Sequence, residues 1–280
     1  MNESPGMELT GTTGTREPPR DQSDPHSATL RPARPPAAES PGEAPSKTGE
    51  DVEQLPDYLV RYYRWAYVWP FAVWFFDHQP IINAILFGNY RRIMNETLRL
   101  IDPDRAGRTL QVAAVYGELT PTLASRIDDL HLVDVASVQL RAARRKLDAR
   151  GLDATIERMD AEALKHADDS FDTVVVFLLL HEMPPEVRRN TLREAARVLR
   201  PGGRLVIAEY GEDAGRHFLH KFWPTRWLLT TSEHFLRSFW DTDFSQLLAE
   251  STARAGKNAE LLEQVEIFGG FYRAMSYRLS

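Results

Sequence analysis

Three residues that could hold a nucleotide cofactor each follow a short apolar run in the chain. Gly117 closes the run that starts at Leu110, and Asp134 follows at close to the spacing of about 20 residues that such sites use. A carboxylate at the end of a second strand accepts hydrogen bonds from both hydroxyls of a ribose. Asp160 follows a third run, where an acidic side chain can accept the exocyclic amine of adenine. The spacing therefore predicts a cofactor site that holds a ribose and an adenine.

Both carboxylates also have a purely structural interpretation. Aspartate is a favoured helix N-cap, so Asp134 could simply start the helix that follows it. Asp160 could belong to a solvated acidic loop. The flanking strand and helix favour ribose contact for Asp134, and Asp160 is favoured because it directly follows its strand. The predicted cofactor wall comprises Val115, Tyr116, Gly117, Asp134, Val135, Asp160 and Ala161.

The loop after the first apolar run departs from the usual nucleotide-binding loop. Such loops carry three glycines, partly so that the backbone can approach the phosphate or cofactor closely. Residues 110–120 carry only Gly117. The loop therefore either binds no nucleotide or belongs to a nucleotide site with altered chemistry.

The elements that must position these residues alternate regularly as strand and helix. The first strand and its loop are expected within 110–120 and further strands at 131–134, 154–157, 172–179 and 204–210. Helices are expected at 121–126, 138–150 and 185–199. The run 172–179 is uninterrupted and rich in Val, as expected of a central parallel strand covered on both faces. A helix near 245–263 precedes strands at 265–268 and 272–279, which a Gly-Gly link predicts to be antiparallel. The pattern predicts a doubly wound α/β domain.

Composition limits the possible classes of function. The net charge of −6 and the pI of about 5.8 argue against a general nucleic-acid binder. The absence of cysteine excludes disulfides, thiolate nucleophiles and zinc–cysteine sites. The start of the chain lacks the apolar region of a secretory signal. No apolar run reaches the roughly 18 residues needed to span a bilayer.

The chain divides by composition into three parts. Residues 1–54 are rich in Pro and lack Phe, Tyr and Trp, so we expect a disordered tail. Residues 55–104 form an aromatic and amphipathic helical segment. Residues 105–280 form the α/β domain, with helices inserted near 214–245 as a cap over the sheet.

The aromatic segment has two interpretations that do not exclude each other. Tyr58, Tyr62, Trp65 and Trp69 share one face of an expected helix, and Pro70 kinks or ends it. These rings could cover the core of the α/β domain. Trp and Tyr with flanking Arg could equally lie in a membrane interface.

These features resemble a class I S-adenosylmethionine-dependent methyltransferase. The resemblance rests on Gly117, Asp134, Asp160 to Leu164, Ser170 to Asp172 and, most specifically, the Arg-Val-Leu-Arg-Pro-Gly-Gly sequence that ends at Gly203. It implies seven strands with an antiparallel last strand and S-adenosylmethionine at the carboxyl ends of the first strands. The chain departs from the family pattern in the loop, where Gln111 replaces an acid and Ala113 and Val115 replace glycines. We expect Ala113 to cost little and Val115 to alter how the methionine end is held.

The loop and the aromatic segment together look like one narrow family, the bacterial rhodoquinone-biosynthesis proteins. The matching stretches are 113–120, 65–70 and 76–90. The resemblance implies conversion of ubiquinone to rhodoquinone, in which an amino group from S-adenosylmethionine replaces a ring methoxy. It also implies assistance by a divalent metal, manganese, and a cytoplasmic protein held peripherally at the inner membrane, where aromatic helices give access to a polyprenyl substrate.

Candidate catalytic residues follow from their positions in this fold. His181 and Glu182 come after the fourth strand, where class I enzymes present substrate-facing side chains, and Tyr116 lies at the loop tip. His181 could transfer a proton or bind metal, although His181 and Glu182 could also be a hydrogen-bonded loop pair. Asp77 and His78 are a further possible metal pair, but adjacent residues diverge on a helix. No spacing specifies a metal site.

Two other functions stay open beside quinone amination. One is a conventional S-adenosylmethionine-dependent methyltransferase that acts on a quinone or phenolic ring. The other is a non-catalytic quinone-binding member of a biosynthetic complex.

Overall fold

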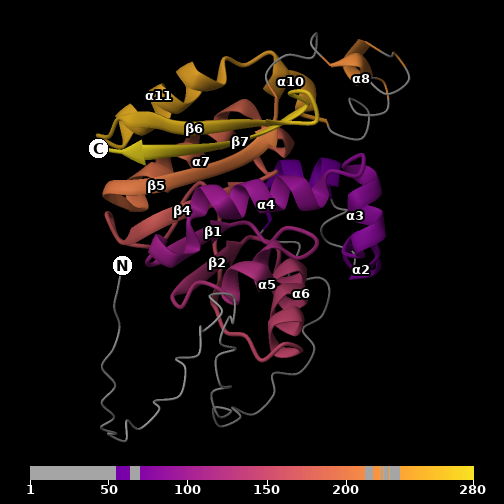
Figure 1. The fold of residues 1–280 in the computed structure, drawn as a ribbon. Helices are drawn as coiled ribbons and strands as arrows, with labels where there is room; N and C mark the ends of the chain where they lie inside the picture. The colour runs from indigo at the N-terminus through magenta and orange to yellow at the C-terminus, as the bar shows by residue number, and fades with distance from the viewer. Residues whose placement is uncertain (1–54, 64–69, 212–216, 222, 224–226, 228–233) are drawn as a thin grey trace, which may run out of the picture. The chain divides into compact units, whose positions relative to one another are not determined.

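The chain is described by a computed structural model that covers residues 55–63, 70–211, 217–221, 223, 227 and 234–280 (Figure 1). The expected tail, 1–54, and the two tryptophans Trp65 and Trp69 lie outside the described residues. Among the described residues, no helix is both long enough and apolar enough to cross a membrane.

A single seven-stranded sheet organises the α/β domain. Its strands lie in the order β3-β2-β1-β4-β5-β7-β6. The bounds are β1 Thr109–Val112, β2 Leu130–Asp134, β3 Thr155–Arg158, β4 Phe171–Phe177, β5 Leu199–Tyr210, β6 Ala259–Ile267 and β7 Tyr272–Leu279. The first five strands are parallel, and β7 runs antiparallel to both β5 and β6. The predicted doubly wound sheet with an antiparallel last strand is confirmed.

Helices cover the sheet on its two faces, as Figure 1 shows for α4 in front of the sheet and α7 behind it. Apart from the short helices that precede α4 and those of the cap, the α-helices that the structure describes are α4 Tyr90–Ile101, α5 Leu119–Ala124, α6 Ser137–Asp148, α7 Pro185–Val198 and α11 Phe244–Arg254. Because both faces of β4 are covered, Val174, Val175 and Val176 are fully buried. The sequence of β4 from Val174 onward is therefore a continuous apolar run, without the alternation of apolar and polar residues that a strand with one exposed face shows.

The segment before α4 consists of short helices. They are η1 Leu59–Tyr63, α2 Pro70–Phe76 and α3 Gln79–Ile85. After α3 the chain passes through Gly88, which adopts a left-handed φ of 80°. The predicted cap is represented by α8 Phe218–Lys221 and α10 Leu236–Trp240; the rest of 214–233 is largely outside the described residues.

Two predictions about local structure were wrong. The helix predicted over 245–263 ends at Arg254, because Gly256 adopts a left-handed φ of 73° and the chain then extends into β6. The strand predicted over 204–210 begins instead at Leu199, although residues 200–203 have no pairing partner on β4 and Gly202 has a left-handed φ of 82°. The extra length is accommodated by a register shift where β5 pairs with Phe171 and Thr173 of β4.

Candidate functional site

A cavity of about 420 Å³ opens at the carboxyl ends of β1, β2, β3 and β4. This size is in the range of cavities that hold small ligands. Ligands in doubly wound folds bind at this edge of the sheet, because the strand ends and their loops converge there. The cavity is therefore the candidate active site.

Most of the predicted site residues line this cavity. Of the seven residues predicted to hold the cofactor, Gly117 alone is not part of its wall. The three predicted catalytic residues, Tyr116, His181 and Glu182, also line it. The fold thus brings together the strand ends that the sequence spacing predicted to share one site. The role of each residue stays a prediction.

Asp134 lies at the end of β2 and is held by backbone amides on both sides. Its Oδ2 accepts from the Ala114 amide at 2.8 Å and its Oδ1 from the Ala136 amide at 2.7 Å. The N-cap of α6 is Ala136, so the alternative of Asp134 as the helix cap is wrong. Burial raises the pKa of Asp134 to about 6, against the opposing effect of these amides and of the charge of Arg158. The carboxylate is oriented toward the cavity and titrates close to neutrality.

Asp160 and Tyr58 form a polar part of the same wall. The Oδ1 of Asp160 accepts from the Glu162 amide at 3.0 Å, which fixes the acidic turn after β3. Burial raises the pKa of Tyr58 above its usual value, and the charges of Asp160 and Glu182 act in the same direction. Tyr58 therefore stays protonated and can donate a hydrogen bond into the cavity.

The loop after β1 is held by side chains from distant parts of the chain. The Gly117 amide donates to Asp77 Oδ1 at 2.8 Å, and Lys146 forms an ion pair with Asp77 and donates to the Gly117 carbonyl at 2.7 Å. The Tyr90 hydroxyl accepts from the amides of Glu118 and Leu119 at 2.6 and 3.2 Å. We call Asp77, Tyr90 and Lys146 the loop clamp.

The packing of the loop clamp by itself requires a glycine at position 117. Its φ is 88°, and an added Cβ would lie 2.5 Å from the Tyr90 hydroxyl. A side chain there would displace the ring that caps the start of α5. Gly117 lies in the loop after β1 but is not part of the cavity wall, and its assignment to cofactor contact stays a prediction.

Left-handed backbone at non-glycine residues occurs both at the cavity and away from it. Of the non-glycine residues described with a left-handed backbone, Phe87, Ala113 and Leu178 line the cavity, at φ of 50°, 71° and 49°. Such residues persist only where the surrounding structure holds them, and they cluster at functional sites. The expectation that Ala113 costs little was wrong, because the position it takes in place of a glycine has a left-handed φ.

His181 is oriented by a buried acid that the sequence analysis missed. Its Nδ1 lies 2.8 Å from Glu209 Oε2 at the end of β5. Glu209 is fully buried and also accepts from the amides of Leu180 and Tyr210 at 2.6 and 3.1 Å. Burial alone would raise the pKa of Glu209, but His181 and these amides hold it below its usual value. An acid inside the apolar run of β5 was the available signal.

A buried arginine fixes the backbone around His181. Arg188 is fully buried and donates to the carbonyls of Leu180 and Met183 at 2.9 and 3.0 Å. Burial lowers its pKa to about 10, so it stays charged at neutral pH. Together, Glu209 and Arg188 hold the ring and the backbone of the short helix η3, Leu180–Glu182, that presents His181 to the cavity.

The remaining wall is apolar and comes mainly from the aromatic segment. It includes Leu59, Tyr63, Phe76, Ile82 and Leu86, which face Phe177 and Met183 from the sheet side. Tyr58 and Tyr62 pack edge-on against Phe235 near α10. The segment thus supplies much of the apolar wall of the cavity, next to the polar strand ends.

The described residues show no three-ligand group for a metal in the cavity wall. The grouping that the structure does bring together, His131, Glu157 and His166, lies outside that wall. Asp77 belongs to the loop clamp, while the His78 ring contacts the Trp74 carbonyl at 2.7 Å, so these neighbours diverge. The cavity therefore offers no observation in support of manganese.

Comparisons with known proteins agree with this architecture. Residues 109–203 match the family described as a methyltransferase domain. The ubiquinone/menaquinone biosynthesis C-methyltransferase UbiE of Ectopseudomonas mendocina (strain ymp) is 28% identical over 206 residues, which cover 71% of this chain and 79% of that protein. UbiE of Dinoroseobacter shibae is 32% identical over 137 residues, which cover 47% and 54%.

Solved structures show the same fold. A putative sarcosine dimethylglycine methyltransferase from Galdieria sulphuraria matches with a TM-score of 0.50 at 16% identity, over 72% of this chain and 90% of that chain. The PH0226 protein from Pyrococcus horikoshii OT3 matches with a TM-score of 0.50 at 17% identity, over 66% and 91%. The chain has the class I methyltransferase fold, and its residues 109–203 match the methyltransferase domain family.

Proposed function

We propose that the protein is an enzyme that uses S-adenosylmethionine to modify the ring of a quinone or phenol. The observation that carries the proposal is one cavity that joins Asp134 and Asp160, the His181–Glu209 pair and the apolar wall of the aromatic segment. Similarity to quinone C-methyltransferases supports a quinone ring as the substrate class. A non-catalytic quinone-binding protein would not need a buried acid behind His181.

The polar wall fits the nucleoside part of S-adenosylmethionine. The Asp134 carboxylate would accept hydrogen bonds from the ribose hydroxyls, and Asp160 would accept the adenine amine. Val135 and Ala161 extend this wall, and Val115 and Tyr116 stand at the end where the loop clamp replaces a glycine-rich loop. When bound, the cofactor supplies an electrophilic sulfonium centre.

His181 is the residue best placed to move a proton at the ring. Because Glu209 holds Nδ1, proton exchange is directed to Nε2, and the buried carboxylate stabilises the imidazolium that forms. Glu182 lies with an oxygen 3.9 Å from Nε2 and lines the cavity beside it. Tyr116 is kept protonated by burial, which raises its pKa, so it acts as a hydrogen-bond donor rather than a base.

Conventional methyl transfer to the ring is the reaction that the relatives favour. In that reaction His181 would remove the proton from the ring carbon or hydroxyl that receives the methyl group. The second candidate is conversion of ubiquinone to rhodoquinone, with S-adenosylmethionine as the amino donor and manganese as an assisting metal. The loop clamp favours it, because it alters the wall where the sulfonium end would lie.

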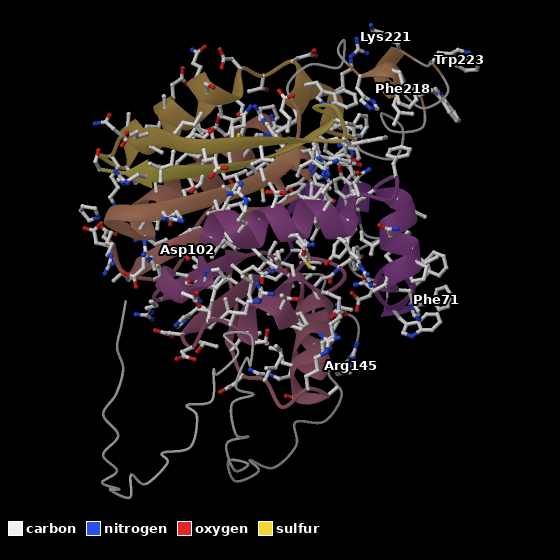
Figure 2. All side chains as sticks on the ribbon, in the orientation of Figure 1. Phe71, Asp102, Arg145, Phe218, Lys221 and Trp223 are labelled. Carbon is white, nitrogen blue, oxygen red and sulfur yellow. The ribbon has the colours of Figure 1, made fainter. Side chains whose placement is uncertain are left out.

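Access to a polyprenyl substrate gives the exposed aromatic side chains a role in docking on the cytoplasmic face of the inner membrane. Phe71 and Trp74 on α2 are 72% and 57% exposed, and Trp223 near α8 is 75% exposed. Figure 2 shows Phe71, Phe218 and Trp223 projecting outward from these segments. Trp and Phe in such positions bind the headgroup boundary of a bilayer.

The masses of the products distinguish methyl transfer from amination. Purified protein is incubated with S-adenosylmethionine and either ubiquinone or an unmethylated ring precursor, with and without manganese, and analysed by mass spectrometry. Gain of a methyl group on the precursor supports methyl transfer. Exchange of methoxy for amino on ubiquinone supports the second candidate, and no product with either substrate would contradict both.

The role of His181 is tested in the same assay. We expect His181→Asn to lower kcat by about 10²- to 10⁴-fold, as for loss of a general base, with S-adenosylmethionine affinity unchanged. Glu209→Gln should lower kcat less and change its pH profile, since it keeps the shape but loses the charge behind the ring. A His181→Asn variant with normal turnover would remove His181 from the mechanism.

Membrane docking is tested by flotation with liposomes that contain anionic lipid. We expect Phe71→Ser combined with Trp74→Ser to reduce the floating fraction. Leu261→Ser with Leu262→Ser on β6 is the matched control, because those side chains are also exposed but lie on the edge strand of the sheet. Equal flotation of both double variants would count against α2 as the docking element.

A further inference from the structure

A second group of chemically capable side chains lies away from the cavity. His131 comes from the start of β2, Glu157 from β3 and His166 from the loop between β3 and β4. One donor atom from each lies within 4.8 Å of the other two. None of the three lines the cavity. His131 precedes Asp134 by three positions on the same strand, which places it about 10 Å away along β2.

The distances within this group match those between the ligands of a small metal ion. Glu157 Oε2 lies 3.7 Å from His131 Nδ1 and 3.0 Å from His166 Nε2. Ligands at about 2.0–2.2 Å in a tetrahedron around zinc are about 3.3 Å apart. The two measured distances fall on either side of that value, so small shifts would place all three donors around one ion.

Asp129 holds His131 in the tautomer that a metal requires. Its Oδ1 lies 3.0 Å from His131 Nε2, and the longer contact of Arg108 Nε to the same nitrogen is 3.3 Å. A metal on Nδ1 requires the proton on Nε2, where Asp129 is placed to accept its hydrogen bond, with the lone pair of Nδ1 toward Glu157. Metal-bound histidines nearly always donate their other N–H to a carboxylate or carbonyl in this way.

One nitrogen of each ring has no hydrogen-bond partner among the described residues. His131 Nδ1 and His166 Nδ1 are buried and have no hydrogen-bond partner among the described residues. Phe171 packs edge-on against both rings, at interplanar angles of 83° and 89°, and fixes their orientation. A buried nitrogen without a partner is costly, and a metal on Nδ1 of His131 would remove that cost.

We propose that His131, Glu157 and His166 bind one divalent transition-metal ion of the zinc type. Two imidazoles and one carboxylate suit such an ion better than calcium or magnesium, which prefer oxygen ligands. The Glu157 side chain is 38% exposed, so water can reach the ion as a further ligand. The ion ties the loop that follows β3 to β2 and β3, and this role is independent of the reaction in the cavity.

The test is a titration of chelator-treated protein with zinc chloride by calorimetry. We expect one site per chain, and we expect cobalt in place of zinc to give the visible absorption of a four- or five-coordinate ion. His166→Ala and Glu157→Gln should abolish this site, and Asp129→Asn should weaken it by about 10- to 100-fold. His78→Ala is the matched control for an exposed histidine and should bind as the wild type does.

Circular dichroism of the metal-free variants guards against loss of the fold. If His166→Ala does not fold, Glu157→Gln still decides the matter, since that side chain is partly exposed. Absence of stoichiometric zinc binding by the wild type would show a hydrogen-bonded group only and would overturn the proposal. Wild-type affinity in Glu157→Gln would overturn it as well.

Discussion

The two ends of the cavity are built in different ways. At the end formed by β2 and β3, Asp134 is held by amides of its own turn and of the neighbouring loop, at 2.7 and 2.8 Å. At the end formed by the loop after β1, the backbone is held by Asp77, Tyr90 and Lys146, which come from three different helical regions. Backbone amides therefore hold the first end, one of them from the loop after β1, and side chains from distant parts of the chain hold the second.

The two ends of the cavity also differ in how closely their sequences follow the usual pattern of this fold. The strand ends retain the carboxylates expected to hold a nucleoside. The loop lacks the glycines of a nucleotide-binding loop and instead uses the loop clamp, with strain at Ala113. Altered chemistry is therefore expected at the loop end, while nucleoside recognition stays conventional.

The largest effect on cofactor affinity is expected at the β2 end. Asp134→Ala removes a charged acceptor, and hydrogen bonds to charged groups contribute about 1.5–3 kcal/mol, so affinity for S-adenosylmethionine should fall roughly 10- to 150-fold. Isothermal titration measures it. Tyr116→Phe at the loop end is the control and should change affinity little. A larger loss of affinity in Tyr116→Phe than in Asp134→Ala would show that the loop end, and not the β2 end, contributes more to cofactor binding.

The loop clamp should show energetic coupling between its charged members. Asp77→Ala and Lys146→Ala each leave a partly buried partner without its contact, at a cost of about 1–3 kcal/mol. The double variant should be destabilised by less than the sum of the single variants. Urea denaturation of the four proteins measures the coupling, and strict additivity would show that the clamp does not act as a unit.

Gly117→Ala tests the packing behind the loop against a matched glycine. Gly88 has a similar φ of 80°, but an added Cβ there meets nothing within 4 Å, whereas at Gly117 it meets Tyr90. Both variants carry the left-handed penalty of about 1–2 kcal/mol. Gly117→Ala should lose about 1–3 kcal/mol more from overpacking, as measured by thermal or urea denaturation. Equal losses of stability in the two variants would show that the Tyr90 side chain moves aside without an energetic penalty.

The pKa of Asp134 gives the β2 end a distinct pH dependence. Burial raises this pKa to about 6, so the folded protein takes up a proton there as the pH falls. Protonation removes the charge that would bind a ribose, so affinity should fall about tenfold near pH 5, while the fold itself is slightly stabilised. Asp134→Asn should flatten both profiles. An unchanged affinity profile in wild type between about pH 7 and pH 5 would contradict this.

The smallest expected effect is relief of strain at the loop end. Ala113→Gly removes the left-handed penalty of about 1–2 kcal/mol but adds about 0.4–1 kcal/mol of unfolded-state entropy. The net change should be a gain of less than about 1.5 kcal/mol, measured by denaturation. A clear loss of stability would mean that the Ala113 methyl group contributes packing that outweighs the strain.

The sequence predicted the fold and the β2 end well because both depend on local pattern. Apolar runs, helix stops and the spacing from Gly117 to Asp134 identify strands whose carboxyl ends must meet at one edge of a parallel sheet. The prediction that the helix continues beyond Arg254 was wrong. The apolar and charged residues of β6 fit a helical period as well as a strand period, and only the left-handed φ of Gly256 shows that the helix ends. Short ambiguous stretches of this kind are decided by their neighbours.

The sequence by itself determined the class of fold, the order of its elements and the carboxylates at the strand ends. Only the tertiary structure decided that Asp77 and Lys146 hold Gly117, that Glu209 orients His181, and that His131 and His166 meet at Glu157. Each of these contacts joins residues from different elements. Local periodicity specifies a helix or a strand, but contacts between these elements depend on how their faces pack. The loop after β1 depends on such contacts, so its form could not be predicted from local sequence.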